Sequence, residues 1–330
     1  LLTSGERISM SLLAIALAER GVPAKSFTGS QAGIITDAVH GKARIVDVTP
    51  GRVQEALDGG NVVIVAGFQG VSQDTKDITS LGRGGSDTTA VALAGALKAD
   101  VCEIYTDVDG VFTADPRIVP NAEKIDQVSF EEMLELAAQG AKILQVRSVE
   151  YGRNHGVRIH VRSSFSIASG TWVVPEEDIV ENAIISGVAH DASEAKITIH
   201  QVPDRPGVAS RLFTALADDH VNIDMIVQNT SAEGRTDISF TMPRGDMDRT
   251  RALLEPLCEE VGAESIEVDP DVAKVALVGA GMKTHPGIAA RMFRALSDAD
   301  VNIGMISTST IRVSVVVAKD QVETAVRAVH

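Results

Sequence analysis

The feature of this sequence that most constrains its fold is an internal repeat in the second half. The 21 residues from Pro206 to Ile226 align with those from Pro286 to Ile306 at an offset of 80, and 13 of the 21 positions are identical. Identity at that level over a fixed spacing indicates a duplicated structural module. The chain therefore contains two copies of one small fold, and its 330 residues leave room for a further domain of about 150 residues in front of them.

Both copies have the same predicted elements: a strand, a Pro-Gly turn, a helix, two strands and a second helix. These elements lie at Lys196–Gln201, Val208–Asp219, Asn222–Asn229, Thr236–Met242 and Asp246–Val261 in copy one, and at Lys274–Val278, Ile288–Ala299, Asn302–Thr308, Arg312–Val317 and Gln321–Val329 in copy two. A last strand at Glu264–Val268 completes copy one as a ferredoxin-like βαββαβ unit. Copy two reaches His330 without that strand, and the apolar segment Ile184–Ala189 is the candidate to replace it. Copy one would then be inserted into copy two.

The first half of the chain alternates apolar runs of strand length with helical segments. The predicted helices are Ser9–Arg20, Thr88–Lys98 and Ser129–Gln139, and the predicted strands are Asn61–Gly67, Val101–Thr106 and Val157–Arg162. Ser129 followed by Glu132 has the spacing of a capping box. Continuous apolar strands that alternate with helices are typical of an α/β domain, with a mainly parallel sheet covered by helices on both faces.

The segment Ile167–Glu181 breaks this alternation. It contains Ser169-Gly170, Pro175 and the acidic cluster Glu176–Asp178, and it has no apolar period, so it is predicted to be a domain junction. We therefore expect a first domain at residues 1–166 and a linker at 167–183. One ferredoxin-like module is expected at 191–269, and the other is expected to combine 184–190 with 270–330.

The chain is acidic, with 45 Asp and Glu against 30 Lys and Arg and a formal net charge of −15. Nucleic acids and anionic membranes require a basic surface, so neither is expected as a partner. No apolar run reaches the ~18 residues of a membrane span. Two distant cysteines, Cys102 and Cys258, indicate no metal motif and a reducing compartment, so we expect a cytoplasmic protein. Residues 1–166 carry 16 basic and 20 acidic side chains, whereas residues 167–330 carry 14 and 25.

A glycine-rich segment, Leu81-Gly-Arg-Gly-Gly-Ser-Asp-Thr-Thr89, leads into a predicted helix. Glycines let a ligand approach the backbone closely, and the free N–H groups of a helix start attract an anion. Arg83 adds a fork suited to a carboxylate or a phosphate, and Asp87 can orient a lysine or a metal ion. The segment has neither the P-loop nor the G-x-G-x-x-G pattern. Taken alone, it is equally well explained as a simple turn.

A second segment, Tyr105-Thr-Asp-Val-Asp-Gly-Val-Phe-Thr-Ala-Asp-Pro-Arg117, begins at the end of a predicted buried strand. Open α/β sheets bind their ligands at that end. The spacing of Asp107, Asp109 and Gly110 resembles a calcium loop, but a third acidic ligand and the bidentate Glu are lacking. Polar residues at the strand end suit a nucleotide pocket better, although an Asx-rich turn explains the segment alone.

Together these segments resemble the aspartate kinases. The matching stretches are Leu2-Thr-Ser-Gly-Glu-Arg-Ile8, Gly67-Phe-Gln-Gly70, Gly82-Arg-Gly-Gly-Ser-Asp87, Thr106–Arg117 and Gly140-Ala-Lys142, in the order seen in that family. The two repeats resemble ACT domains, the amino-acid-sensing units of aspartate kinases, and the whole is most similar to the actinobacterial, lysine- and threonine-regulated type. The resemblance implies an amino-acid-kinase fold followed by tandem ACT modules. It also implies transfer of the γ-phosphoryl group of ATP, bound with Mg²⁺, to the side-chain carboxylate of L-aspartate, which is the first step towards lysine, threonine and methionine.

Carried over position by position, the resemblance implies roles for the residues of the kinase half. Glu6 would hold the α-ammonium group of aspartate and Arg83 its α-carboxylate, with Phe68 and Ser86 in the same pocket. Asp87 would orient the family's catalytic lysine and forms the catalytic set with Arg83. The nucleotide would be surrounded by Thr106, Asp107, Phe112, Arg117, Lys142 and Ile143. No metal site formed by the chain's own residues is expected.

Each repeat also contains a candidate effector site. A Pro-Gly turn leads into a helix whose free N–H groups can bind the carboxylate of an amino acid, and polar residues beyond the helix can bind its other groups. The candidates are Asp204, Arg205, Pro206, Gly207, Val208, Ala209, Asn222, Ile223, Asp224 and Gln228 in copy one, and Ile288, Ala289, Asn302, Ile303, Ser309 and Thr310 in copy two. Spacing alone explains these residues equally well as turns, whereas the duplication and the resemblance favour lysine and threonine as effectors of a homo-oligomer joined through its ACT domains. Thr310 stands where related enzymes often carry Glu. Loss of that carboxylate would weaken binding of a cationic effector, so sensitivity to lysine is a less secure expectation than amino-acid sensing in general.

The family's Lys-Tyr-Gly-Gly-Ser segment, which supplies the catalytic lysine, belongs upstream of Leu1 and is not in this sequence. We therefore expect the 330-residue chain to form no detectable ADP in an aspartate-dependent assay. Two alternatives remain open. The chain could be another amino-acid kinase, acting on glutamate, N-acetylglutamate or a nucleotide, or an amino-acid-binding regulatory protein with an inactive kinase half.

Overall fold

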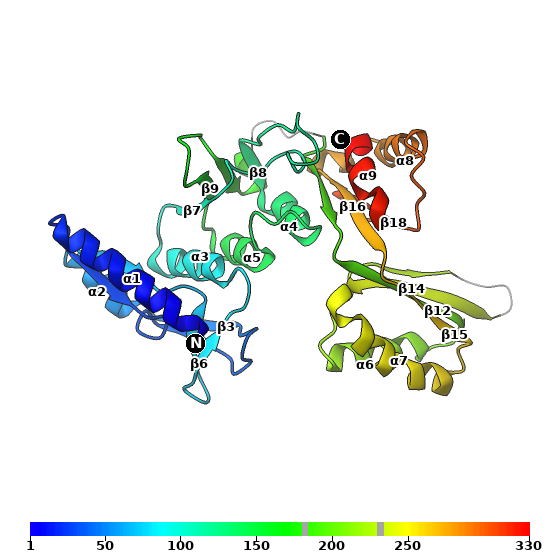
Figure 1. Cartoon of the computed structure of the whole chain (residues 1–330), viewed down its shortest axis with the longest axis horizontal. Coiled ribbons are helices and arrows are strands. Elements are labelled where there is room, and N and C mark those ends of the chain that lie inside the picture. Colours follow the sequence, from blue (N-terminus) through cyan, green and yellow to red (C-terminus); the bar gives the residue numbers. More distant parts are fainter. Residues whose placement is uncertain (180–183, 230–233) are drawn as a thin grey trace. The chain divides into compact units, whose positions relative to one another are not determined.

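The computed structural model describes residues 1–179, 184–229 and 234–330 and divides them into two compact units. Unit 1 comprises residues 1–111, 124–138 and 142–179, and unit 2 comprises residues 112–123, 139–141 and the described part of 184–330. Two short segments, 112–123 and 139–141, therefore fold with unit 2 although the residues before and after them belong to unit 1. Figure 1 shows the elements of both units. Within the described residues, no helix is long and apolar enough to cross a membrane.

Unit 1 is an α/β fold with three small sheets. Its helices are α1 (Leu2–Glu19), α2 (Gly51–Asp58), α3 (Gly85–Leu97), α4 (Phe130–Ala138) and α5 (Val146–His155). Its strands are β1 (Ala24–Phe27), β2 (Ile34–Thr36), β3 (Ile45–Val48), β4 (Val62–Val65), β5 (Gln69–Ser72), β6 (Ile78–Ser80), β7 (Cys102–Thr106), β8 (Gln127–Ser129), β9 (Ile159–Ser163) and β10 (Thr171–Val174). The sheets have the orders β1-β4, β3-β2-β5-β6 and β7-β9-β10-β8. Four of the seven pairings among residues 1–179 are parallel.

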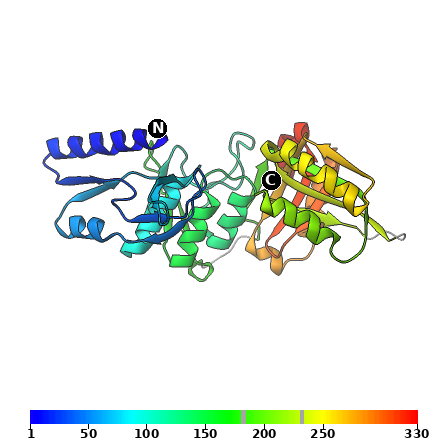
Figure 2. The same ribbon diagram turned by 90° about the horizontal axis from the view of Figure 1, so that it is seen from below.

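Three helix starts in unit 1 can be compared with those that the sequence predicts. The capping box is confirmed, because the Glu132 N–H donates to Ser129 Oγ at 3.2 Å and the Ser129 N–H donates to Glu132 Oε2 at 3.2 Å. Helix α3 begins three residues before the predicted start, which places Ser86 and Asp87 in its first turn. Helix α1 begins at Leu2 rather than Ser9, and it runs as one uninterrupted rod in Figure 2. Glu6 is thus a helical residue.

Residues 167–179, at the predicted domain junction, contain a strand that the sequence analysis did not predict. Strand β10 lies there, pairs with β8 and β9, and buries Thr171, Val173 and Val174 completely. Trp172 stacks on the ring of His160 with the ring centroids 3.9 Å apart. A four-residue run between a Ser-Gly pair and Pro175 is too short to show a period, and one of its two partner strands, β8, is distant in the sequence. Residues 180–183 of the expected linker lie outside the described residues.

The first module of unit 2 contains β12 (Glu194–Pro203), α6 (Val208–Asp218), β13 (Ile226–Gln228), β14 (Arg235–Pro243), α7 (Met247–Val261) and β15 (Ser265–Asp269). This is the predicted βαββαβ order, and the sheet runs β13-β14-β12-β15 with every pairing antiparallel. Both helices lie on one face of that sheet, as Figure 1 shows. They cover a core of Ile197, Leu212, Phe240 and Leu254. Strand β13 is shorter than predicted, since Asn222 to Met225 precede its regular pairing.

The second module contains β16 (Val272–Val278), α8 (Ile288–Asp298), β17 (Met305–Thr308), β18 (Arg312–Ala318) and α9 (Val322–Val329). Its sheet runs β11-β16-β18-β17, and β11 (Gly187–Asp191) pairs antiparallel with β16. In this sheet β11 has the edge position that β15 has in the first module. The second module thus obtains its fourth strand from the chain that precedes the first module. The two sheets of unit 2 meet at a small apolar cluster that includes Met225, Val272 and Met305.

Candidate functional site

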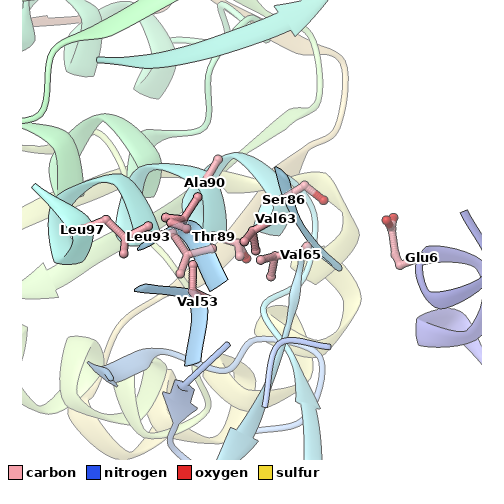
Figure 3. A pocket seen from close by; sticks show the side chains of 11 residues that line it. Glu6, Val53, Val63, Val65, Ser86, Thr89, Ala90, Leu93 and Leu97 are labelled. Carbon is pink, nitrogen blue, oxygen red and sulfur yellow. The ribbon is translucent and has the colours of Figure 1, made fainter. Parts of the chain in front are cut away.

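A cavity in unit 1 contains two of the residues expected to bind aspartate. It has a volume of about 420 Å³ and is lined by Glu6, Gly67 and Ser86, together with apolar side chains of α2, β4 and α3. Figure 3 shows Glu6 projecting from α1 on one side, with the Ser86 hydroxyl directed towards that side from the start of α3. A carboxylate and a hydroxyl at one end of a cavity can bind an ammonium group. Phe68 and Arg83 do not line this cavity.

Phe68 has a strained backbone beside the cavity. Its φ of 51° is in the left-handed region, which is rare for an aromatic residue. The conformation is stabilised from two sides: the Phe68 N–H donates to Thr89 Oγ1 at 3.1 Å, and the Phe68 carbonyl accepts from the Leu81 N–H at 2.9 Å. Backbone strain of this kind concentrates at ligand-binding sites. Gly67 is also required there, since a Cβ at that position would lie 2.8 Å from Ser86 Oγ.

The glycine-rich loop before α3 is closely packed against its neighbours. Gly84 has a φ of 65°, and a Cβ there would lie 1.7 Å from Gln145 Cγ, so only glycine fits. Arg147 donates to the carbonyls of Leu81 at 3.0 Å and Ala43 at 2.8 Å and so fixes the loop from α5. Sequence reasoning missed Gln145 and Arg147, because neither is part of a recognisable motif and the contacts span up to 104 residues. The Arg83 side chain is exposed at the turn of this loop.

Asp87 points from the first turn of α3 into a partly buried environment. Burial raises the pKa of its carboxyl group. The pKa of the Cys102 thiol is raised to about 11, mainly by burial of the thiol and also by the nearby Asp87 carboxylate. None of the hydrogen bonds within the described residues involves an Asp87 oxygen. A half-buried carboxylate without a partner is suited to accept a cationic group.

The expected nucleotide residues are distributed over several short segments. Thr106 ends β7 and donates from Oγ1 to Asp107 Oδ1 at 3.1 Å, with Asp107 exposed. Lys142 is exposed and Ile143 half-buried in the turn before α5. Phe112 and Arg117 belong to segment 112–123 of unit 2. The Arg117 guanidinium pairs with Asp115 at 2.7 Å, and this hydrogen bond lowers the pKa of Asp115 despite its partial burial.

The two expected effector sites start from equivalent turns in unit 2. Gly207 and Gly287 both have left-handed backbones, with φ of 96° and 90°, and each directly precedes its helix, α6 or α8. Most candidate side chains are exposed or half-buried, whereas Val208 and Ile288 are core residues. The exposed candidates are Asp204, Arg205, Pro206, Asn222, Asp224, Gln228, Asn302, Ser309 and Thr310, and the half-buried ones are Ala209, Ile223, Ala289 and Ile303. Asn302 and Ile303 also line a cavity of about 340 Å³ beside α8.

Sequence reasoning missed an ionic group next to Asp224. Lys274, in the middle of β16 and only 1% exposed, donates to the Asp224 carboxylate, and its Nζ lies 3.9 Å from Glu194 Oε1. Burial raises the pKa of Glu194, and the neighbouring Lys274 charge opposes that effect. The lysine joins the second module to two carboxylates of the first. A sequence signal existed, because Ala195-Lys196 and Ala273-Lys274 open equivalent strands of the two repeats.

Comparison with known proteins identifies the family. The family model described as the amino acid kinase family matches residues 1–163, and an ACT domain model matches residues 189–255 and 275–330. Aspartokinases of Mycolicibacterium smegmatis and Corynebacterium glutamicum are each 58% identical over 334 aligned residues, which cover 100% of this chain and 79% of each relative. The chain belongs to the aspartokinase family. It is an ATP-using phosphotransferase with ACT-type regulatory modules, as its resemblance to the aspartate kinases implied.

Solved aspartokinase structures share the fold. E. coli aspartokinase III in complex with aspartate and ADP, described as the R-state, superposes with a TM-score of 0.85 at 29% identity and covers 99% of this chain and 73% of that one. The same E. coli enzyme in complex with lysine and aspartate, described as the T-state, gives a TM-score of 0.73 with the same coverage. The similarity to both confirms the predicted class, an α/β kinase domain followed by ACT modules.

Proposed function

We propose that this aspartokinase phosphorylates the side-chain carboxylate of L-aspartate in the cavity of unit 1. The observation that carries the proposal is the joint presence of Glu6, Gly67 and Ser86 around that cavity, beside the strained Phe68. Glu6 would bind the α-ammonium group, and the exposed Arg83 of the adjoining loop would bind the α-carboxylate. The E. coli relative was solved with aspartate and ADP.

Charge neutralisation is the main requirement of phosphoryl transfer to a carboxylate, because two anions must approach each other. Asp87 would orient the catalytic lysine, and Thr106, Asp107, Phe112, Arg117, Lys142 and Ile143 would bind the nucleotide. Mg²⁺ bound with ATP would neutralise phosphate charge. The exposed Asp107 carboxylate at the end of β7 is a hard oxygen ligand of the kind that Mg²⁺ prefers.

We further propose that lysine or threonine regulates the enzyme from the turns before α6 and α8. The free N–H groups of these helices support binding of an amino-acid carboxylate, and lysine is present in an E. coli relative. The ACT modules would also join the subunits of a homo-oligomer. Ile226 of the edge strand β13 and Ile306 of the edge strand β17 occupy equivalent repeat positions and are 52% and 44% exposed, which suits a sheet edge paired with another chain.

The proposed organisation starts from a kinase part at residues 1–166, the first ACT module at 191–269 and the second at 184–190 with 270–330. Strand β10 pairs with β8 and β9 of the kinase sheet, so we extend the proposed kinase part from residue 166 to Val174. Cytoplasmic localisation is part of the same proposal.

Isothermal titration of the 330-residue chain with aspartate, ADP, lysine and threonine tests the proposal. We expect aspartate to bind the parent chain, with affinity about 10-fold lower in Glu6→Gln because one charged hydrogen bond is lost. Effector binding should be unchanged in that variant. A chain that binds effectors but neither aspartate nor ADP, even with the family's lysine-bearing segment joined in front of Leu1, would instead be a regulatory protein with an inactive kinase half. Kinase turnover is measured with the family's lysine-bearing segment joined in front of Leu1.

A further inference from the structure

One of the segments proposed to bind the nucleotide is built into the core of the second ACT module. Ala114, Ile118 and Val119 are buried in the same apolar cluster as Val188 of β11 and Val326 of α9. These three side chains have at most 8% of their surface exposed. The segment 112–123 therefore takes its position from the regulatory module and not from its neighbours in sequence.

Polar contacts attach the backbone of the segment at two points. The Val188 N–H donates to the Thr113 carbonyl at 2.8 Å, and Thr113 Oγ1 lies 2.9 Å from His330 Nε2. Further along, Arg327 donates from Nε to the Ile118 carbonyl at 3.1 Å. The segment is also closed on itself, because the Glu123 N–H donates to Thr113 Oγ1 at 3.0 Å.

The attached points directly adjoin the side chains assigned to the nucleotide. Phe112 precedes Thr113, and Arg117 precedes Ile118. The Arg117 side chain is 88% exposed and pairs with Asp115. The Asp115 side chain is 16% exposed and accepts from both Nε and Nη2 of Arg117. Because the guanidinium itself is exposed, a phosphate oxygen can approach it beside Asp115. The position that the Arg117 guanidinium can reach depends on the position of the adjoining Ile118 backbone.

We propose that Arg327 and His330 of the C-terminal helix region are positioning residues for the nucleotide. They touch no substrate. Arg327 fixes the Ile118 carbonyl and hence Arg117, and His330 fixes Thr113 and hence Phe112. The proposal rests on the proposed function, which assigns Phe112 and Arg117 to the nucleotide. Movement of α9 would then alter nucleotide affinity without any change in the aspartate residues.

Three variants, two at Arg327 and one at Glu323, isolate the hydrogen bond from Arg327 to the Ile118 carbonyl. Arg327→Met keeps the apolar stem and removes the donor, and Arg327→Lys can restore a donor. Glu323→Gln is the matched control, because Glu323 is the other partner of Arg327, at 2.7 Å, and its loss leaves the bond to Ile118 in place. Arg117→Ala tests the assignment of the nucleotide residue itself. His330→Gln is the mildest variant, suited to the case in which Arg327→Met does not fold.

ADP binding to the 330-residue chain is the first measurement. We expect Arg327→Met to weaken ADP binding about 10-fold, with aspartate and threonine affinities unchanged, Arg327→Lys to recover part of the loss and Glu323→Gln to match the parent. If Arg117→Ala weakens ADP binding and Arg327→Met does not, the positioning role is wrong. If Arg327→Met weakens all three ligands alike, the role is general stability and the proposal also fails.

Amide hydrogen exchange of segment 112–123, measured without nucleotide, is the second measurement. Faster exchange in Arg327→Met, and not in Glu323→Gln, is expected from the loss of the attachment. Unchanged exchange would overturn the inference even if ADP binding were lost. If Arg117→Ala leaves ADP binding intact, the assignment of Arg117 to the nucleotide fails, while the exchange result still decides whether α9 holds the segment.

Discussion

Asp87 combines a catalytic assignment with an unfavourable environment. Burial raises the pKa of its carboxyl group above the ordinary value of 3.8. The folded chain therefore binds more protons at this group than the unfolded chain. The free energy of unfolding consequently falls as the pH rises from 3.8 through the raised pKa. The ionised Asp87 therefore lowers stability, as is common for groups of the kind that its proposed catalytic role requires.

Replacing Asp87 by Asn should therefore separate stability from activity. Asp87→Asn should unfold at a higher urea concentration than the parent at pH 7, because a buried charge is removed, and the difference should vanish below pH 3.8. Turnover, measured with the lysine-bearing segment present, should fall by about 100-fold, the effect typical of losing one electrostatic group. An Asp87→Asn chain that is less stable than the parent at pH 7 would contradict this account.

Lys274 presents the opposite case, a buried charge whose partners are in place. Removing it by Lys274→Met leaves Asp224 and the buried Glu194 without their cation, and Glu194 Oε2 has no hydrogen-bond partner within the described part of the chain. We expect a loss of about 3 kcal/mol in the free energy of unfolding, measured by urea denaturation. Lys196→Met, at the equivalent position of the first repeat, is the control and should change stability little. Adding Asp224→Asn to Lys274→Met should restore part of the loss, and a fully stable Lys274→Met chain would rule the ion group out as a stabiliser.

At the scale of elements, the sequence predicts what depends on local spacing. The repeated modules follow from a fixed offset, and the capping box follows from residues 129 and 132. The pairing of β10 with β8 and the loop contacts of Arg147 could not be predicted in this way, because their partners are distant in the sequence. The same holds for segment 112–123. Its sequence indicates a turn near a nucleotide, whereas its position depends on β11 and α9.

The capping box can be tested at the start of α4. Ser129→Ala removes the acceptor for the Glu132 N–H and one donor to the Glu132 carboxylate, both within the buried first turn. The expected loss in the free energy of unfolding is about 1 kcal/mol. Glu131→Gln, in the same turn but without a capping contact among the described residues, serves as the comparison. Equal stability of Ser129→Ala and the parent would show that the cap contributes nothing.

At the scale of the whole molecule, the effector residues and segment 112–123 belong to the same compact unit. The proposed effectors would therefore act on the proposed nucleotide segment 112–123 within that unit. If threonine binding and nucleotide binding are coupled in this way, the coupling must be reciprocal, since both affinities report one free energy. Kinetic constants carry no such requirement. Equilibrium binding is accordingly the stricter test.

We expect saturating threonine to weaken ADP binding about 10-fold, and saturating ADP to weaken threonine binding by the same factor. Both ratios are measured by isothermal titration on the same preparation, so that any oligomer present is common to the two. Asn302→Ala, in the second effector site, should abolish the threonine effect while ADP binding stays at the effector-free value. Unequal ratios would mean that the two ligands do not act on one equilibrium. If neither ligand changed the affinity for the other, the second ACT module would hold segment 112–123 in the same position whether or not an effector is bound.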